Sequence, residues 1–222
     1  MQLNFGAREV AIKLVYYGPA LSGKTTNLKA LHELTREDSR GRLMTLETKD
    51  DRTLFFDMLP IVIRAEGDTG MSLRVKVFTV PGQVVHTSTR RLVLQGADGV
   101  AFVADSQIGE QESNATSFLD LKTNLKELGR DVGELPLVIQ FNKRDLPNIR
   151  TDAEIDELAK RGREPAFKAC ALSGVGVLET FFGLLELAWT RLDAEHGLQE
   201  KLGIESSSFM KRCSSAMARG VK

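Results

Sequence analysis

The sequence predicts an α/β fold with a mainly parallel sheet, because strand-like and helix-like segments alternate and a glycine-rich turn joins the first pair. The expected strands are AIKLVYY, IVIRA, LRVKVFTV, GVAFVAD, LPLVIQFN and AFKACA, which are rich in β-branched and other apolar residues. Helices are expected from Thr25, from about Asn114, from Thr151 and from Gly176. Gly67 and Gly70 separate IVIRA from LRVKVFTV, which indicates a hairpin. One antiparallel edge strand is therefore expected, with helices on both faces of the sheet.

The first and last helices are supported by apolar residues at helical spacing. Leu28 and Leu31 recur in TNLKALHEL after the glycine-rich turn, which favours a helix there. Leu185, Trp189 and Leu192 recur near the end of the chain, so Trp189 is expected in the core.

Composition limits the class of protein. The 30 basic and 30 acidic residues cancel, so the net charge gives no reason to expect nucleic acid as a partner. The two cysteines, Cys170 and Cys213, make no disulfide framework, so a reducing cytoplasm is the expected location. No secretory signal and no transmembrane segment are expected from the sequence. Residues 1–197 are expected to form one domain, and residues 198–222 a C-terminal extension that is helical or flexible.

The turn GPALSGKTT has the phosphate-binding P-loop pattern Gly18-x-x-x-x-Gly23-Lys24-Thr25. Its glycines let backbone N–H groups face an anion at the positive end of a helix. Lys24 is expected to reach the β- and γ-phosphates, and Thr25 to ligate Mg²⁺. The alternative, an ordinary glycine-rich turn, is disfavoured by the position between strand and helix. The expected phosphate-binding residues are Gly18, Ala20, Leu21, Ser22, Gly23, Lys24, Thr25 and Thr26.

A second loop, FNKRD, follows a later strand at the carboxyl end, where ligands bind in sheets of this kind. Asn142, Lys143 and Asp145 resemble the NKxD motif, whose aspartate accepts hydrogen bonds from N1–H and N2–H₂ of guanine. Adenine lacks that pair of donors. An ordinary polar turn ended by Pro147 is the alternative.

A third loop, TVPGQ, follows the strand LRVKVFTV. Gly82 can donate its backbone N–H to a γ-phosphate, and Gln83 stands where GTPases place the residue that orients the attacking water. Together the three loops predict a site for GTP or GDP with Mg²⁺.

Motif order and spacing over roughly residues 10–192 resemble the Ras-like small GTPases. The strings KLVYYGPALSGKTTNL, DRTLFFDMLP, TVPGQ and GVAFVADSQ are similar to the bacterial MglA branch, the polarity and gliding-motility switches. The resemblance implies a Ras-like P-loop GTPase fold and slow GTP hydrolysis, with a GTP form that recruits effectors at a cell pole. It also implies an activating partner, a dimeric roadblock-fold protein of the MglB type. Thr79 departs from the pattern, because most Ras-like proteins have a metal-supporting aspartate there.

The resemblance assigns further roles. Thr53 matches the switch I threonine that joins Thr25 on Mg²⁺. Arg52 matches a catalytic arginine that this branch supplies from its own chain, with a solvated charge as the alternative. The loop that reads guanine O6 through a backbone N–H corresponds to Cys170, Ala171 and Leu172.

Two segments could contact other molecules. The first is an apolar cluster after switch I, part core and part effector or activator surface, formed by Phe55, Phe56, Met58 and Leu59. The second is the tail after Glu205, whose apolar residues fall at near-helical spacing among basic ones. This tail could touch an anionic membrane or a partner, or form a short solvated or packed end. It has no C-terminal prenylation motif, so recruitment is expected to go through proteins.

One other class of function stays open, a scaffold that keeps the fold and is either locked to the nucleotide or indifferent to it. A P-loop kinase is disfavoured, because NKRD and Gln83 would have no role in it. Ala20 stands where Ras-like proteins usually have glycine. Its methyl group is expected beside the γ-phosphate, so the sequence predicts an unusually slow GTPase that responds weakly to an activator.

Overall fold

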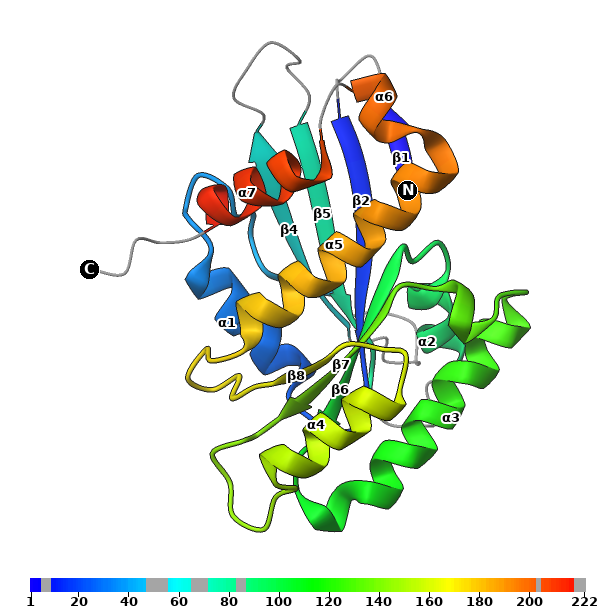
Figure 1. Ribbon diagram of the computed structural model, residues 1–222, viewed down its shortest axis with the longest axis vertical. Helices are drawn as coiled ribbons and strands as arrows, with labels where there is room; N and C mark the ends of the chain where they lie inside the picture. The colour runs from blue at the N-terminus through cyan, green and yellow to red at the C-terminus, as the bar shows by residue number, and fades with distance from the viewer. Residues whose placement is uncertain (5–8, 47–55, 65–71, 83–86, 203–204, 218–222) are drawn as a thin grey trace.

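A computed structural model describes residues 1–4, 9–46, 56–64, 72–82, 87–202 and 205–217. In its sheet, neighbouring strands follow the order β3-β4-β5-β2-β6-β7-β8 (Figure 1). Strand β1 lies outside this series and pairs with β2. The strands are β1 Gln2–Asn4, β2 Glu9–Tyr17, β3 Met44–Leu46, β4 Phe56–Arg64, β5 Ser72–Thr79, β6 Gly99–Asp105, β7 Leu137–Asn142 and β8 Ala166–Lys168. The run from β5 to β8 is parallel, whereas β4 is antiparallel to β5 and β3 to β4. The expected parallel sheet with an antiparallel edge is confirmed, and the short β3 extends that edge.

Helices cover both faces of the sheet (Figure 1). They are α1 Lys24–Leu34, α2 Thr87–Leu94, α3 Gln111–Glu127, α4 Asp152–Arg161, α5 Val177–His196, α6 Leu198–Leu202 and α7 Ser206–Met217. One core lies under α1, α5 and α7, and the other under α2, α3 and α4. Strand β2 serves both, with Leu14 and Tyr16 in the first core and Val15 and Tyr17 in the second. Alternation of side chains along a strand produces this division.

Helix starts follow local capping chemistry. Thr151 is the N-cap of α4, and its hydroxyl accepts the Glu154 N–H at 3.2 Å. Gly176 precedes α5 with a φ of 75°, a left-handed conformation that glycine adopts readily. Helix α3 begins at Gln111, ahead of the expected Asn114, because a 3₁₀ turn over Ile108–Glu110 leads into it.

Two expected strands have different ends in the structure. Strand β4 begins at Phe56, ahead of the expected IVIRA, and it includes Phe56 and Met58, which are half-buried, and Leu59, which is buried; Phe55 of the expected apolar cluster lies outside the described residues. Strand β8 ends at Lys168, and the expected AFKACA is therefore too long. Beyond Lys168, Cys170 makes only an isolated bridge to its loop neighbours.

The C-terminal extension packs against the sheet. Helix α7 lies beside α5 over β4 (Figure 1), and the rings of Trp189 and Phe209 stack with centroids 3.8 Å apart. Cys213 and Met217 are buried, and burial raises the pKa of the Cys213 thiol to about 12. The apolar face of α7 is thus covered by protein here. Among the described residues, no helix has both the length and the hydrophobicity that a membrane crossing needs.

Candidate functional site

The P-loop connects β2 to α1 and takes a backbone path that side chains would obstruct. Gly18 has a φ of 148°, and a Cβ there would lie 2.3 Å from the Val103 carbonyl oxygen. Gly23 has a φ of 97°, and a Cβ there would lie 2.2 Å from Asn142 Nδ2. These contacts explain why the motif needs glycine at both positions. The loop borders a cavity of about 470 Å³ at the carboxyl ends of β2 and β5.

Lys24 lies in this cavity with its ammonium group folded back onto its own loop. Its Nζ donates to the carbonyl oxygens of Gly18 at 3.0 Å and Pro19 at 2.5 Å. Burial, followed by repulsion from Arg90, lowers its pKa to about 7. A phosphate oxygen would offer this buried cation a stronger acceptor than a neutral carbonyl. The side chain is therefore suited to an anion in the cavity.

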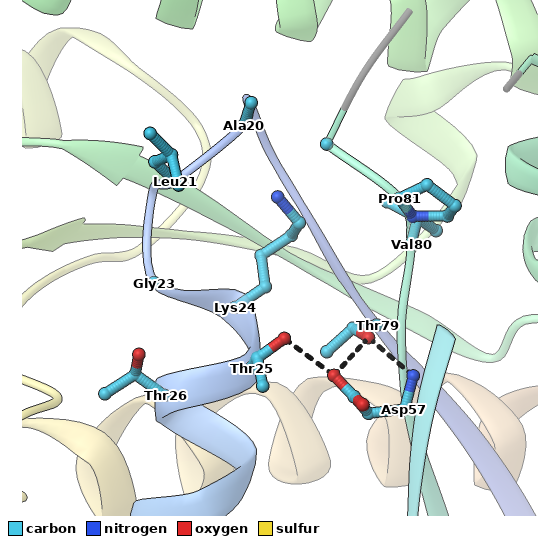
Figure 2. Close-up of a pocket in the computed structure, with 11 residues that line it drawn as sticks. Ala20, Leu21, Gly23, Lys24, Thr25, Thr26, Asp57, Thr79, Val80 and Pro81 are labelled. Atoms are coloured by element: carbon cyan, nitrogen blue, oxygen red, sulfur yellow. Dashed lines mark hydrogen bonds between the residues drawn. The ribbon is translucent and has the colours of Figure 1, made fainter. Parts of the chain in front are cut away.

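Thr25 points at a carboxylate that the sequence analysis did not select (Figure 2). Its hydroxyl donates to Asp57 Oδ2 at 2.6 Å. Thr79 donates to the same oxygen at 3.2 Å and accepts the Asp57 N–H at 2.9 Å. Thr45 donates to the other oxygen, Oδ1, at 2.9 Å. Three hydroxyl groups thus hold one buried carboxylate beside the P-loop.

This corner has the donor set of a magnesium site. Hydroxyl and carboxylate oxygens are hard ligands of the kind that Mg²⁺ prefers, and the ion usually keeps several waters beside one or two carboxylates. Within the described ranges, no group of three or more His, Cys, Asp or Glu residues is placed to hold a metal ion. Thr25 and Asp57 each supply an oxygen of this kind beside the P-loop.

Asn142 joins the P-loop to the loop after β8. Its Nδ2 donates to the Ser22 carbonyl at 2.8 Å, and its Oδ1 accepts the Ala171 N–H at 2.9 Å. One N–H of the loop expected to read guanine O6, that of Ala171, is thus bonded to Asn142 in this structure. Cys170 is buried, whereas the Leu172 side chain is exposed at the loop tip. The P-loop and the loop after β8 therefore lie together at the carboxyl ends of the parallel strands.

Lys143 and Asp145 lie next along the same loop. Lys143 has a φ of 64°, and its Nζ pairs with Asp105 Oδ2 at 2.6 Å. Asp105 is buried at the end of β6, so this ion pair ties two neighbouring strand ends together. Asp145 is exposed, so its carboxylate is accessible to the base of a nucleotide.

Gly82 lies against the P-loop. A Cβ at this position would lie 2.4 Å from Ala20 Cα, so only glycine allows this approach. Ala20 itself is exposed and lines the cavity with Leu21. Three predicted site residues fall outside the described residues: Arg52, Thr53 and Gln83.

The residues that sequence reasoning missed come from separate elements. Asp57 could have been selected from the sequence, because it is an acid in the otherwise apolar strand sequence FFDMLP. Arg90 of α2 is fully buried and reaches Gly82, yet it belongs to no motif in the sequence. Its neighbours in the STRRLVL segment give no reason to prefer it over Arg91.

No protein-family model matches the chain. The chain is 45% identical over 191 residues to mutual gliding-motility protein MglA of Myxococcus xanthus, covering 86% of this chain and 96% of that protein. It is 27% identical over 179 residues to ADP-ribosylation factor-like protein 6 of Caenorhabditis briggsae, covering 78% and 84%. Elongation factor 4 of Desulfitobacterium hafniense is 23% identical over 179 residues, which span 79% of this chain and 26% of that protein. Because the identity to MglA extends over nearly the whole of both chains, this protein belongs to the MglA family of Ras-like small GTPases.

Proposed function

We propose that the protein is a guanine-nucleotide-dependent switch that binds GTP or GDP with Mg²⁺, hydrolyses GTP slowly and controls polarity or motility through effectors. One observation supports the proposal most directly. Lys24, the Thr25–Asp57 pair and the exposed Asp145 all lie at the end of the sheet where the parallel strands have their carboxyl ends. The gliding-motility name of the M. xanthus relative supports the biological role.

The phosphates belong in the cavity that the P-loop borders. There the Lys24 ammonium exchanges the carbonyls of Gly18 and Pro19 for phosphate oxygens. The guanine base belongs between the loops after β7 and β8, where Asp145 accepts its N1–H and N2–H₂. Asn142 sets the relative position of these parts, because it bonds to both the P-loop and Ala171.

Thr25 would hold Mg²⁺ with Asp57 supporting it, and Thr53 would join Thr25 on the ion in the GTP form. The ion neutralises charge on the β- and γ-phosphates when it is bound. Asp57 supplies from β4 the carboxylate that Thr79 lacks, and the Thr79 hydroxyl fixes that carboxylate from the neighbouring strand. The acid that supports the metal thus lies on β4, one strand away from the β5 position where most Ras-like proteins have it.

We assign hydrolysis to residues that lie outside the described ranges. Gln83 orients a water for in-line attack on the γ-phosphorus, and the bond from that phosphorus to the β-phosphate oxygen breaks to give GDP and phosphate. Arg52 stabilises the charge that spreads over the γ-phosphoryl oxygens. Ala20 places a methyl group beside this volume and slows the step.

The proposed partners are a dimeric roadblock-fold activator of the MglB type and effectors at a cell pole. Part of the surface near switch I is suited to such contacts, because Phe56 and Met58 are only half-buried on β4. The proposed location is the cytoplasm, with recruitment through proteins. The covered apolar face of α7 favours that route over direct membrane contact.

The test begins with binding of fluorescent GTP and GDP to the full chain in Mg²⁺, with ATP as the competitor. We expect tight binding of both guanine nucleotides and no displacement by ATP at equal concentration. Single-turnover GTP hydrolysis is then measured with and without a roadblock-fold dimer. Displacement by ATP would show that the base assignment is wrong. Absence of nucleotide binding would favour the scaffold alternative.

A further inference from the structure

Arg90 of α2 is a fully buried arginine whose guanidinium faces the loop that follows β5. Its Nε donates to the Pro81 carbonyl oxygen at 3.0 Å, and its Nη2 donates to the Gly82 carbonyl oxygen at 2.6 Å. One side chain therefore holds two consecutive peptide groups of this loop. The planar fork of arginine can span two acceptors in this way, whereas lysine offers a point charge.

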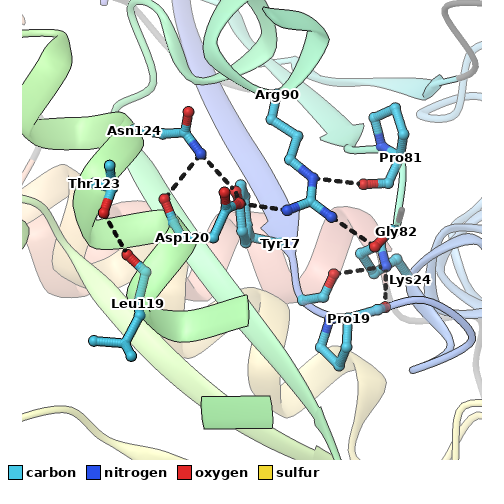
Figure 3. Close-up of polar contacts among 11 residues, drawn as sticks. Tyr17, Pro19, Lys24, Pro81, Gly82, Arg90, Leu119, Asp120, Thr123 and Asn124 are labelled. Atoms are coloured by element: carbon cyan, nitrogen blue, oxygen red, sulfur yellow. Dashed lines mark hydrogen bonds and ion pairs between the residues drawn. The ribbon is translucent and has the colours of Figure 1, made fainter. Parts of the chain in front are cut away.

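A polar network holds Arg90 in turn (Figure 3). Its Nη1 pairs with Asp120 of α3, and that carboxylate also accepts the hydroxyl of Tyr17 from β2. Asn124 donates to the Tyr17 oxygen at 3.1 Å and to the Asp120 carbonyl at 2.8 Å. The guanidinium also lies over the Tyr17 ring, 5.5 Å from its centroid. Side chains of two elements, β2 and α3, thus fix the direction in which Arg90 donates.

The geometry of the peptide bond gives this arrangement a consequence for the nucleotide. The Pro81 carbonyl and the Gly82 N–H belong to the same peptide group, and no described peptide bond is cis. In a trans peptide the C=O and N–H bonds point in opposite directions. Because Arg90 binds the carbonyl, the Gly82 N–H points away from Arg90. Gly82 also lies against Ala20 of the P-loop, at the border of the phosphate cavity.

We propose that Arg90 is a positioning residue for the triphosphate state, which turns the Gly82 N–H toward the γ-phosphate by holding the Pro81 and Gly82 carbonyls. The proposal rests on the proposed guanine-nucleotide function. Asp120 supports it by neutralising and orienting the buried guanidinium. Since GDP has no γ-phosphate, this positioning acts on GTP and not on GDP.

Arg91 is the matched control. It follows Arg90 on the same helix and also pairs with an acid of α3, because its Nη1 lies 2.6 Å from Glu127 Oε2. However, its side chain is 42% exposed, compared with 1% for Arg90. Arg91 therefore joins α2 to α3 at the surface and leaves the phosphate loop untouched.

The experiment compares Arg90→Lys, Arg90→Gln and Asp120→Asn with Arg91→Gln. Dissociation constants for fluorescent GDP and for a non-hydrolysable GTP analogue are measured in Mg²⁺, together with the thermal unfolding midpoint. For Arg90→Gln we expect about a 10- to 100-fold loss of affinity for the GTP analogue, the range of one hydrogen bond to a charged group. The GDP constant should stay within about twofold of wild type. Arg90→Lys and Asp120→Asn should give smaller losses with the same selectivity, and Arg91→Gln none.

The ratio of the two constants decides the outcome. Equal losses for GDP and the GTP analogue would assign Arg90 a purely structural role and overturn the inference. Unchanged affinity for both would overturn it as well. If Arg90→Gln does not fold, Arg90→Lys and Asp120→Asn provide the same ratio. Wild-type protein that binds neither nucleotide would instead overturn the proposed function on which the inference rests.

Discussion

The two halves of the candidate site are built in different ways. The motif half consists of the P-loop and the loops after β7 and β8, and its residues stand in short contiguous patterns. There, Asn142 bonds to a backbone carbonyl and a backbone N–H, and Lys24 bonds to carbonyls of its own loop. The switch half consists of β4, the end of β5 and α2. There, side chains from separate elements meet, with Asp57 and Arg90 at the centre.

Because of this difference, the motif half is suited to nucleotide binding and the switch half to sensing the γ-phosphate. Asn142 joins two loops of the motif half through their backbone groups, so this half is suited to hold base and phosphates in both nucleotide states. The contacts that the Asp57 and Arg90 side chains make with other elements depend on how these elements sit against one another. The switch half is therefore suited to report whether a γ-phosphate is present. Substitutions in the two halves should affect different measured quantities.

The largest effect is expected from Lys24→Ala in the motif half. Removing the ammonium takes away charge-assisted bonds to two phosphates, so affinity for both GTP and GDP should fall by about a hundredfold to ten-thousandfold. Equilibrium binding of fluorescent nucleotides measures this loss. Lys29→Ala is the matched control, because Lys29 is an exposed lysine on the same helix. Gln83→Leu and Arg52→Ala should leave binding nearly intact and slow hydrolysis, and an equal loss of binding in all three variants would contradict the assigned roles.

Asp145→Asn tests the base-reading part of the motif half. The amide reverses one hydrogen-bonding end, so affinity for GTP should fall by about a hundredfold while affinity for xanthosine triphosphate rises. Competition binding with the two nucleotides measures the exchange. Because Asp145 is exposed, the thermal unfolding midpoint should not change. A parallel loss of both nucleotides would show that the residue supports the loop and does not read the base.

The motif half could be predicted from sequence because its chemistry is local. Glycines at 18 and 23, Lys24 and the NKRD loop each occupy a fixed spacing that the backbone geometry requires. The strand ends that bring these loops together follow from the parallel sheet, which strand and helix patterns also predict. The expected phosphate, base and metal roles of these residues remain predictions.

The switch half could not be predicted in the same way. Asp57 reaches Thr25 because β4 runs antiparallel to β5 with Met58 opposite Phe78, and the hairpin expected from the sequence left that register open. Arg90 and Arg91 are adjacent and chemically identical, and only the packing of α2 decides which one is buried. Such contacts depend on tertiary structure, which a pattern of single residues does not encode.

Asp57→Asn tests the metal corner of the switch half. Loss of the carboxylate charge should lower the apparent affinity for Mg²⁺ in the GTP complex by about 10- to 100-fold, the usual range for residues that support a metal. Titration of nucleotide release against free Mg²⁺ measures it. The double substitution Asp57→Thr with Thr79→Asp returns the acid to the β5 position and should recover part of the affinity. An Asp57→Asn variant with an unchanged Mg²⁺ requirement would show that Asp57 has no part in the metal site.

Ala20→Gly tests the contact between the two halves, because Ala20 belongs to the P-loop and lies against Gly82. Binding should be spared, since the N–H donors of the loop are unchanged. Removing the methyl should free space for Gln83 and an arginine, so that hydrolysis rises by about tenfold or more, within the cost of an ångström-scale displacement of a catalytic group. Single-turnover hydrolysis of both proteins, with and without a roadblock-fold activator, measures the effect. Equal rates under both conditions would mean that the catalytic arginine clears the methyl and that Ala20 is neutral.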